Sequence, residues 1–385
     1  MTAERSVADV DWHKLEPVSP FYLFARQDAT LRDEYQAGWN LTRIFPMNVL
    51  GFQTHRDAFA VSFTQAEMKR KLKELADPVI SDDELARRYG LKSNRDWSLP
   101  DARIAARSGA ATPPQRVAYR LFDDHWSEFS GLTMDYPRRE LLDHVAGRDN
   151  LSLLVPRGIS TENWRHAFVV DKPANDCVIS NRSREANQVL PLWRFGPGGV
   201  KQENFSSDFR DFIDSRYHHH FSPEEILGYI YAVLNAPTYR TRYTQSLRID
   251  FPSVTFPATA EDFETLSSLG WALMQAHLLR ELPRRGLATY HGRGDHTVEA
   301  VRYSPEEQAI SINKTQFFKP VPQAVWEFHI GGYQVLDKYL KLRKGRTLSL
   351  DEINHVAAIA DSLAFTSEQM AKIDEAYTAA FPNRG

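Results

Sequence analysis

The most regular pattern of apolar positions in the chain predicts a helix that begins after Ser222. Ser222, Pro223 and Glu225 provide an N-cap hydroxyl, a proline at the first helical position and a carboxylate at the third. Apolar side chains then recur at helical spacing at Ile226, Leu227, Ile230, Val233 and Leu234. Pro237 ends this helix, because proline lacks an amide hydrogen and its ring clashes with the preceding turn.

A second short helix is expected after Pro237, followed by an extended segment over residues 250–257. The two helices form an elbow that carries three tyrosines and three arginines, namely Tyr231, Tyr239, Tyr243, Arg240, Arg242 and Arg248. Arginine and tyrosine side chains on a rigid elbow suit phosphate contact and base stacking. The alternative is an ordinary pair of core helices with a solvated basic face.

Elsewhere in the chain, apolar residues recur with the spacing of a helix in some segments and with that of a strand in others. Amphipathic patterns predict helices over residues 65–75, 82–89, 209–213 and 261–282, and closing helices over 350–380. Extended patterns predict strands over 21–24, 58–63 and 189–193, strands with arginine-rich turns over 118–171, and a hairpin near 298–312. Gly331 and Gly332 are predicted to end a strand before a helix that begins at Tyr333.

These elements predict an α+β fold, in which a mixed part of strands and loops packs on a helical part with a C-terminal hairpin and closing helices. The expected divisions are a polar leader over residues 1–20, a mixed α/β part over 21–220 and a mainly helical part over 221–385. A length of 385 residues is typical of two or three packed subdomains.

Charge and cysteine content restrict the function. The formal net charge is −3, so nucleic-acid binding would depend on local basic patches. Cys177 is the single cysteine, which excludes an internal disulfide and a cysteine-rich zinc site. Neither a bilayer-spanning apolar run nor a signal-peptide pattern is present, and we therefore expect a cytoplasmic protein that does not contact a membrane.

Arginines at the predicted strand ends and turns are the candidate binding residues. They are Arg56, Arg120, Arg138, Arg139, Arg157 and Arg165. Loops on a rigid sheet commonly carry function, and arginine can contact both phosphates and base edges. The alternative is structural pairing with the nearby carboxylates of Asp57, Asp123, Asp124, Asp135 and Asp143.

Catalytic signals are weak. Phe195-Gly-Pro-Gly-Gly199 superficially resembles the glycine loop of an S-adenosylmethionine site, but a polar, unpatterned stretch follows it. His218-His-His220 and the group of His291, Asp295 and His296 lack convincing metal-ligand spacing. Asn235-Ala-Pro-Thr-Tyr239 lacks the paired prolines of an adenine methyltransferase loop, and no phosphate-binding loop of the ATPase type occurs.

Several longer sequence motifs point to one family. They are Gly51–Asp57, Asn150–Arg157, His166–Asp171, Tyr229–Tyr243, Leu247–Pro252 and Val325–Leu340. Together they resemble the C-terminal specificity domain of Type ISP restriction-modification enzymes, and the resemblance extends from about residue 20 to 371. The chain departs from the family at His55, where the family has glycine, and at Leu121, where it has proline.

The resemblance implies sequence-specific recognition of double-stranded DNA in a phage-defence system, with residues 21–220 as the target-recognition part. DNA contact is expected at Arg56, Arg120, Arg138, Arg139, Arg157, Arg240 and Arg242. Catalytic, cofactor and metal residues are not expected in this chain. S-adenosylmethionine, ATP and magnesium would bind only to methyltransferase, translocase and nuclease parts, in the same enzyme or a partner subunit.

Two alternatives stay open. The first is a stand-alone enzyme with a diverged methyltransferase or metal site, which would use the Phe195–Gly199 loop and the histidines. The second is a protein-interaction scaffold that docks a partner through the aromatic segment Val325–Leu340.

Overall fold

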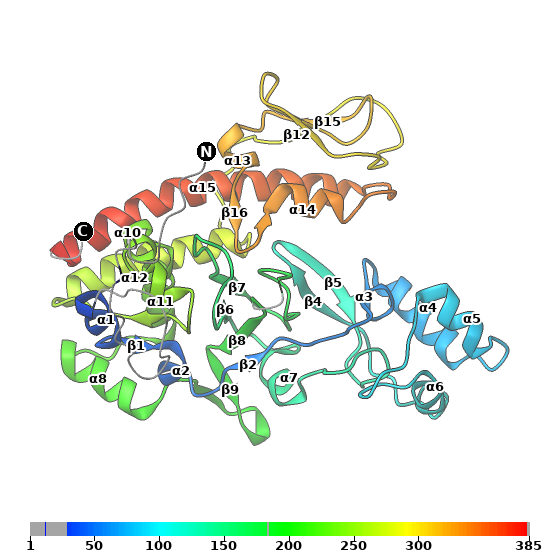
Figure 1. The fold of residues 1–385 in the computed structure, drawn as a ribbon, viewed down its shortest axis with the longest axis horizontal. Coiled ribbons are helices and arrows are strands. Elements are labelled where there is room, and N and C mark those ends of the chain that lie inside the picture. Colours follow the sequence, from blue (N-terminus) through cyan, green and yellow to red (C-terminus); the bar gives the residue numbers. More distant parts are fainter. Residues whose placement is uncertain (1–11, 13–28, 183–184, 383–385) are drawn as a thin grey trace.

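The computed structural model describes residues 12, 29–182 and 185–382. The strand expected over residues 21–24 lies outside the described residues, as does the expected leader over 1–20 apart from residue 12. Figure 1 shows helices gathered at one end of an elongated molecule, small sheets at its centre and a helical projection at the other end.

Three helices form the main helical layer: α9 (Pro223–Asn235), α12 (Ala260–His277) and α15 (Leu350–Ala380). α9 and α12 approach closely where Gly228 meets Gly270, since a Cβ on Gly270 would lie 2.0 Å from the Gly228 carbonyl oxygen. Capping boxes begin α9 at Ser222 and α15 at Ser349. α15 runs along the molecule and reaches from the helical end toward the sheets (Figure 1).

The central sheet has the strand order β2-β8-β6-β7, and all its neighbours are antiparallel. Its strands are β2 (Val49–Leu50), β8 (Asn187–Pro191), β6 (Ser152–Pro156) and β7 (Phe168–Val170). Every residue of β6 and β7 is buried, which fits their nearly continuous apolar sequences.

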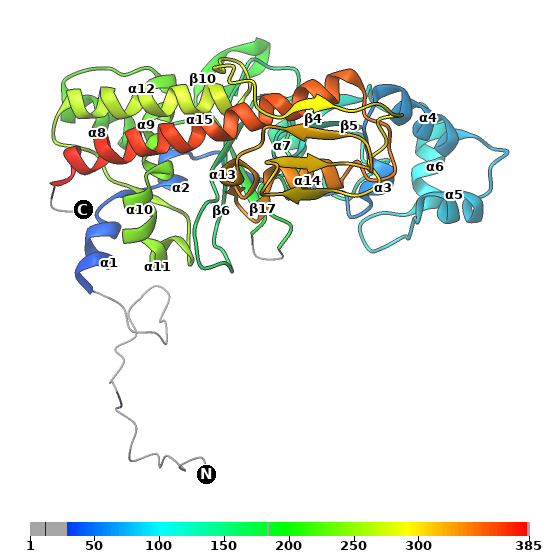
Figure 2. The same cartoon turned by 90° about the horizontal axis from the view of Figure 1, so that it is seen from above.

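Two further antiparallel sheets flank the centre. One has the order β3-β5-β4, with β3 (Val61–Ser62), β5 (Asp123–Ser127) and β4 (Gln115–Arg120). The other has the order β12-β15-β14-β13, with β12 (Thr289–His291), β15 (Phe317–Lys319), β14 (Ala309–Ser311) and β13 (Arg302–Ser304). In Figure 2 this second sheet lies beside α15.

Short strand pairs complete the β structure. They are β1 (Trp39–Asn40) with β11 (Ser253–Val254), β9 (Trp193–Phe195) with β10 (Lys201–Glu203), and β16 (His329–Ile330) with β17 (Tyr333–Gln334). The glycines after Phe195 lie in the turn between β9 and β10, so a strand follows them rather than a helix.

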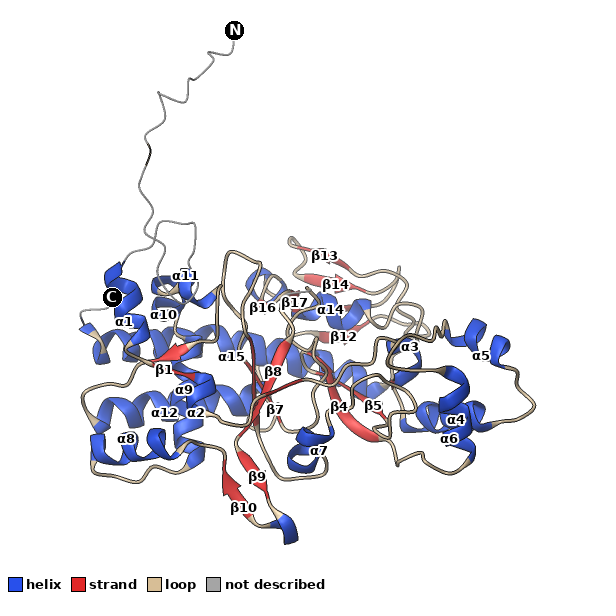
Figure 3. Cartoon of the chain, turned by 60° about the horizontal axis from the view of Figure 1, so that its bottom comes forward, coloured by secondary structure: helices blue, strands red, loops and turns tan. Residues whose placement is uncertain are grey.

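The remaining helices are mostly short and connect these layers (Figure 3). They are α1 (Ala29–Gln36), α2 (Leu41–Ile44), α3 (Asp57–Ala60), α4 (Gln65–Ala76), α5 (Asp82–Tyr89), α6 (Leu99–Arg107), α7 (Arg139–Val145), α8 (Ser207–Tyr217), α10 (Pro237–Arg242), α11 (Thr244–Leu247), α13 (Gln323–Trp326) and α14 (Val335–Lys341). α4, α5 and α6 form the projection opposite the main helical layer.

Two large apolar cores share α15. One joins α9 and α12 to the central sheet and contains Ile373 and Tyr377 of α15. The other joins the central and C-terminal sheets to α14 and contains Val356 and Ile359 of α15. The first core draws residues from both sides of residue 220, so the division at that position stays a prediction.

The α+β class predicted from the sequence is confirmed. Three local predictions are wrong. Residues 58–63 form the end of α3 and then β3 rather than one strand, and the helix expected from Tyr333 begins two residues later because Tyr333 pairs in β17. The closing segment is one helix, α15, rather than several. Within the described ranges, no helix combines the length and apolarity needed to cross a bilayer.

Candidate nucleic-acid interface

Four chain segments meet on one face of the molecule, which we call the arginine face. They are the β6–β7 loop (residues 157–167), residues 179–182 and 185–186 before β8, helices α10 and α11, and the β16–β17 turn. The amide of Ile159 donates to the carbonyl of Arg248 at 3.2 Å, and the amide of Gly331 donates to the carbonyl of Arg165 at 2.7 Å. In Figure 2, α10, α11 and the loop beyond β6 project from the same side.

A buried carboxylate, Glu185, holds two of these segments together. Ser160 donates to it through its amide at 2.8 Å and its hydroxyl at 2.6 Å, and the Ser180 hydroxyl donates at 2.6 Å. Burial alone would raise the pKa of Glu185, but these donors and His166 outweigh it and lower the pKa to about 2. Glu185 is therefore a charged anchor beneath the arginine face.

His166 completes the anchor as a neutral side chain. Its Nε2 lies 3.2 Å from Glu185, and its Nδ1 accepts the Arg165 amide at 3.2 Å. Burial lowers the pKa of His166 to about 4, against the attraction of Glu185. The hydrogen-bond pattern thus assigns the proton to Nε2 at neutral pH.

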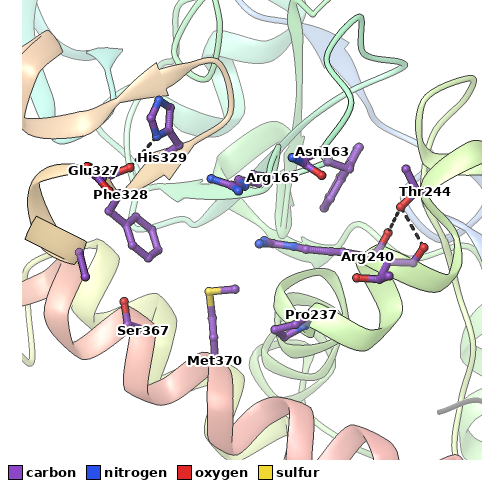
Figure 4. A pocket seen from close by; sticks show the side chains of 13 residues that line it. Asn163, Arg165, Pro237, Arg240, Thr244, Glu327, Phe328, His329, Ser367 and Met370 are labelled. Carbon is purple, nitrogen blue, oxygen red and sulfur yellow. Dashed lines mark hydrogen bonds between the residues drawn. The ribbon is translucent and has the colours of Figure 1, made fainter.

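The arginine face contains a cavity of ≈ 530 Å³ between α10, α15, residues 163–165 and residues 324–329. Figure 4 shows the side chains of Arg165 and Arg240 extending into it. Arg240 is fixed, because its Nε donates to the Leu234 carbonyl at 2.6 Å and its Nη2 to Asn235 at 2.7 Å. Burial, together with the nearby charge of Arg165, lowers the pKa of Arg240 to about 10, so it stays cationic at neutral pH.

Two of the predicted DNA-contacting arginines are buried in ion pairs. The Arg56 guanidinium lies 2.5 Å from Asp135 and 4.0 Å from the centre of the Trp97 ring. The Arg120 guanidinium lies 3.3 Å from Asp57 and donates to Asn175 at 2.9 Å. In both cases the arginine pairs with a carboxylate of the protein, which is the alternative to DNA contact that the sequence left open.

Two others have protein partners at half-buried positions. Arg138 adopts a positive φ of 57° and donates to Gln53 at 3.0 Å. Arg242 donates two hydrogen bonds to the carboxylate of Glu34, one from Nε at 3.0 Å and one from Nη2 at 2.9 Å. These guanidinium groups would have to exchange partners to contact a nucleic acid.

Arg139 and Arg157 are exposed. Arg139 donates to the Ser130 carbonyl at 2.9 Å. Arg157 has a side chain that is 69% exposed and contacts Asp250 at 3.0 Å, an ion pair that solvent screens strongly. Arg157 and Arg240 lie on the arginine face, whereas Arg56, Arg120, Arg138 and Arg139 belong to a separate group around β4 and α7.

The tyrosines of the elbow do not form a stacking platform. Tyr231 and Tyr239 are fully buried and Tyr243 is 2% exposed. Tyr239 donates to the Ser253 carbonyl at 2.8 Å, and Tyr231 pairs with His277 at 2.6 Å. The expectation of base stacking at these tyrosines is wrong, since their rings fill the core between α9, α10 and β11.

Three exposed arginines of the same face were not among the seven residues at which DNA contact was expected: Arg165, Arg182 and Arg248. Arg165 and Arg248 carried a usable signal, since the former precedes a predicted strand and the latter ends the elbow. Arg182 lies in a loop without a motif, and only the tertiary structure places it on the arginine face.

The fold recurs in solved structures of longer chains bound to DNA or to a DNA substrate mimic. The DrdV–DNA complex matches with a TM-score of 0.71 and 18% identity over 97% of this chain and 41% of that one. A nuclease-deletion mutant of the Type ISP restriction-modification enzyme LlaGI with a DNA substrate mimic matches with a TM-score of 0.67 and 16% identity, over 96% of this chain and 30% of that one. DNA-bound LlaBIII, an ATP-dependent Type ISP enzyme, matches with a TM-score of 0.68 and 14% identity, over 92% of this chain and 24% of that one.

The fold is thus that of one region of longer chains, two of which are Type ISP restriction-modification enzymes, and this chain spans less than half the length of each of these relatives. Residues 43–372 match the Type ISP C-terminal specificity domain, and the chain belongs to that family. No protein of curated function matches the sequence.

Proposed function

We propose that this chain recognises a short double-stranded DNA sequence as the specificity part of a Type ISP restriction-modification enzyme. The observation that carries the proposal is the arginine face, which a buried anchor supports on a scaffold of the Type ISP specificity fold. Solved structures with this fold include complexes with DNA and with a DNA substrate mimic, which supports the same assignment.

The arginines divide by the contact that each can make. Arg139 and Arg157 are exposed enough to reach base edges, and a good bidentate arginine–guanine pair discriminates by roughly 1–3 kcal/mol. Arg138 and Arg242 could add contacts after exchanging their partners. Arg56 and Arg120 would act by holding the β4 region in shape, because their guanidinium groups are already paired.

Catalysis would come from outside this chain. Methyltransferase, translocase and nuclease parts, in one enzyme or a partner subunit, would bind S-adenosylmethionine, ATP and magnesium, while this chain would hold them at the target sequence. The scaffold alternative is less well supported, because Val325, Tyr333, Leu336, Tyr339 and Leu340 of its proposed docking segment are buried.

Selection of bound duplexes from a randomised DNA pool, at two salt concentrations, tests this function. Enrichment of one short motif, with binding that weakens as salt increases, is the expected result. Replacing Arg157 and Arg139 together with alanine should relax that motif, whereas Arg87→Ala on exposed α5 should not. Failure of the chain to enrich any motif, even with a cognate methyltransferase part added, would contradict the proposal.

A further inference from the structure

We propose that the cavity formed by Arg165 and Arg240 binds one phosphate group of the DNA backbone. The inference rests on the proposed function and assigns this cavity a positioning role, distinct from the reading of bases. Its ligand is a phosphodiester, recognised by charge and hydrogen bonding.

The cavity has an excess of positive charge. Among the residues that the structure describes, two arginines line it, and Glu327 is the only carboxylate in its lining. Glu327 is exposed and already accepts a hydrogen bond from Gln323 at 2.8 Å. The positive charge of Arg165 lowers the pKa of Arg240, so the two guanidinium groups repel each other. An anion between them would relieve their mutual repulsion.

Both arginines keep hydrogen-bond donors available. Nε and Nη2 of Arg240 are used by Leu234 and Asn235, and within residues 29–182 and 185–382 no group accepts a hydrogen bond from Nη1. The exposed Arg165 guanidinium has no acceptor among the described residues either. Arg240 is therefore a preorganised donor, and Arg165 is an exposed donor without a competing acceptor among the described residues.

Trp164 also lines this cavity. The indole nitrogen of Trp164 is buried, and no described residue accepts a hydrogen bond from it. Trp164 itself is only 2% exposed. The Arg240 guanidinium lies 5.6 Å from the centre of the Trp164 ring, so Trp164 packs beside the fixed arginine.

The position of the cavity favours DNA as the source of the phosphate. Its walls include the β6–β7 loop and α10, which also shape the arginine face around Arg157 and Arg248. A duplex lying on this face would bring its backbone to the mouth of the cavity. Phosphate contacts fix register and orientation but carry no sequence information directly.

The test compares the full chain with its Arg165→Ala variant. Arg165 makes no side-chain hydrogen bond to a described residue, so the variant should fold normally. Affinity for one duplex is measured over a series of salt concentrations. Loss of one phosphate contact should lower the slope of log K against log salt by about 0.9 and leave the preferred sequence unchanged. Arg87→Ala, the same charge change on distant α5, should leave the slope unchanged.

A second titration uses inorganic phosphate alone, with binding followed calorimetrically. Phosphate binding by the parent chain that is lost in Arg165→Ala supports the anion site independently of DNA. Duplex binding with an unchanged slope in Arg165→Ala would overturn the phosphate site while DNA recognition stands. Phosphate binding that depends on Arg165, with no duplex binding, would overturn DNA as the source and contradict the proposed function instead.

Discussion

Gly270 determines how closely α12 approaches α9. A Cβ at this position would lie 2.0 Å from the Gly228 carbonyl oxygen and 2.8 Å from the Ala232 amide nitrogen. Both are backbone atoms of α9, so the helices would have to separate to accommodate even one methyl group.

We therefore expect Gly270→Ala to lower the free energy of unfolding by about 3 kcal/mol, at the upper end of the usual cost of overpacking. Urea denaturation measures the change. Ser268→Ala on the exposed side of α12 should shift stability by less than about 0.5 kcal/mol. Equal midpoints for the two variants would show that the α9–α12 crossing adjusts freely.

Protonation of His166 should destabilise the fold as the pH falls. Its folded pKa is about 4, below the ordinary value of 6.5, because it is buried. Above pH 6.5 the imidazole is neutral in both states; between 6.5 and 4 the unfolded chain binds a proton that the folded protein does not. The expected loss approaches 3 kcal/mol by about pH 4.

Chemical denaturation at several pH values checks this dependence. Burial also lowers the pKa of His277, to about 3, so His166→Gln should reduce the dependence rather than abolish it. His219→Gln, at an exposed position, should leave it unchanged. A pH dependence that His166→Gln does not alter would contradict the role given to this residue.

The structural role of a single residue was predictable where it depends on residues nearby in the sequence. Ser222 and Pro223 form the predicted N-cap and proline start of α9, and Glu225 completes a capping box, since all three act within one helical turn. The partners of Arg242 and Arg157 were not predictable, because Glu34 and Asp250 lie far away in the sequence. The base-stacking interpretation of Tyr239 and Tyr243 failed for the same reason: burial is decided by distant segments.

At the scale of elements, an ion-pair network joins β5 to α14 and α15. Asp123 accepts from Arg343 at 2.8 and 3.1 Å, and Arg343 also contacts Glu352 at 2.8 Å and packs 3.6 Å over Tyr339. Burial opposes ionisation of Asp123, but His125 and Arg343 outweigh it and hold its pKa well below the ordinary value.

Removing one partner of this network should be costly. Asp123→Asn leaves the buried Arg343 with incomplete pairing, and we expect a loss of about 3–5 kcal/mol. Combining it with Arg343→Met should cost less than the sum of the single changes, which a double-mutant cycle would measure. Additive losses would mean that the two side chains stabilise β5 and α14 independently.

Elements with long amphipathic patterns were predicted well. α4 and α5 begin and end within a residue of the expected positions. The strand expected over residues 58–63 failed because Asp57–Ala60 forms a single helical turn, and the local alternation of apolar residues is too short to distinguish the two. The strand order of each sheet could not be derived, since it depends on pairing between distant segments.

At the scale of the whole molecule, α15 connects the two large cores. Val356 and Ile359 pack in the core of the sheets, and Ile373 and Tyr377 pack in the core of α9 and α12. Because α15 is one continuous helix, loss of its packing in one core should weaken its packing in the other core.

We expect the two cores to unfold in one cooperative transition. Val356→Ala and Ile373→Ala each remove buried methyl groups and should lower stability by roughly 1–4 kcal/mol. In both variants, tryptophan fluorescence and far-UV circular dichroism should give the same lowered midpoint. Two separate transitions, each affected by one variant, would show that the cores are independent.

The position of α15 in the sequence has a consequence for synthesis on the ribosome. Both cores are assembled from segments that are translated earlier, yet each lacks part of its interior until this helix has left the exit tunnel. At about 5–20 residues per second, α15 takes several seconds to emerge. Throughout that period the nascent protein exposes the apolar surfaces that α15 will cover, so we expect chaperones to assist the docking of this helix.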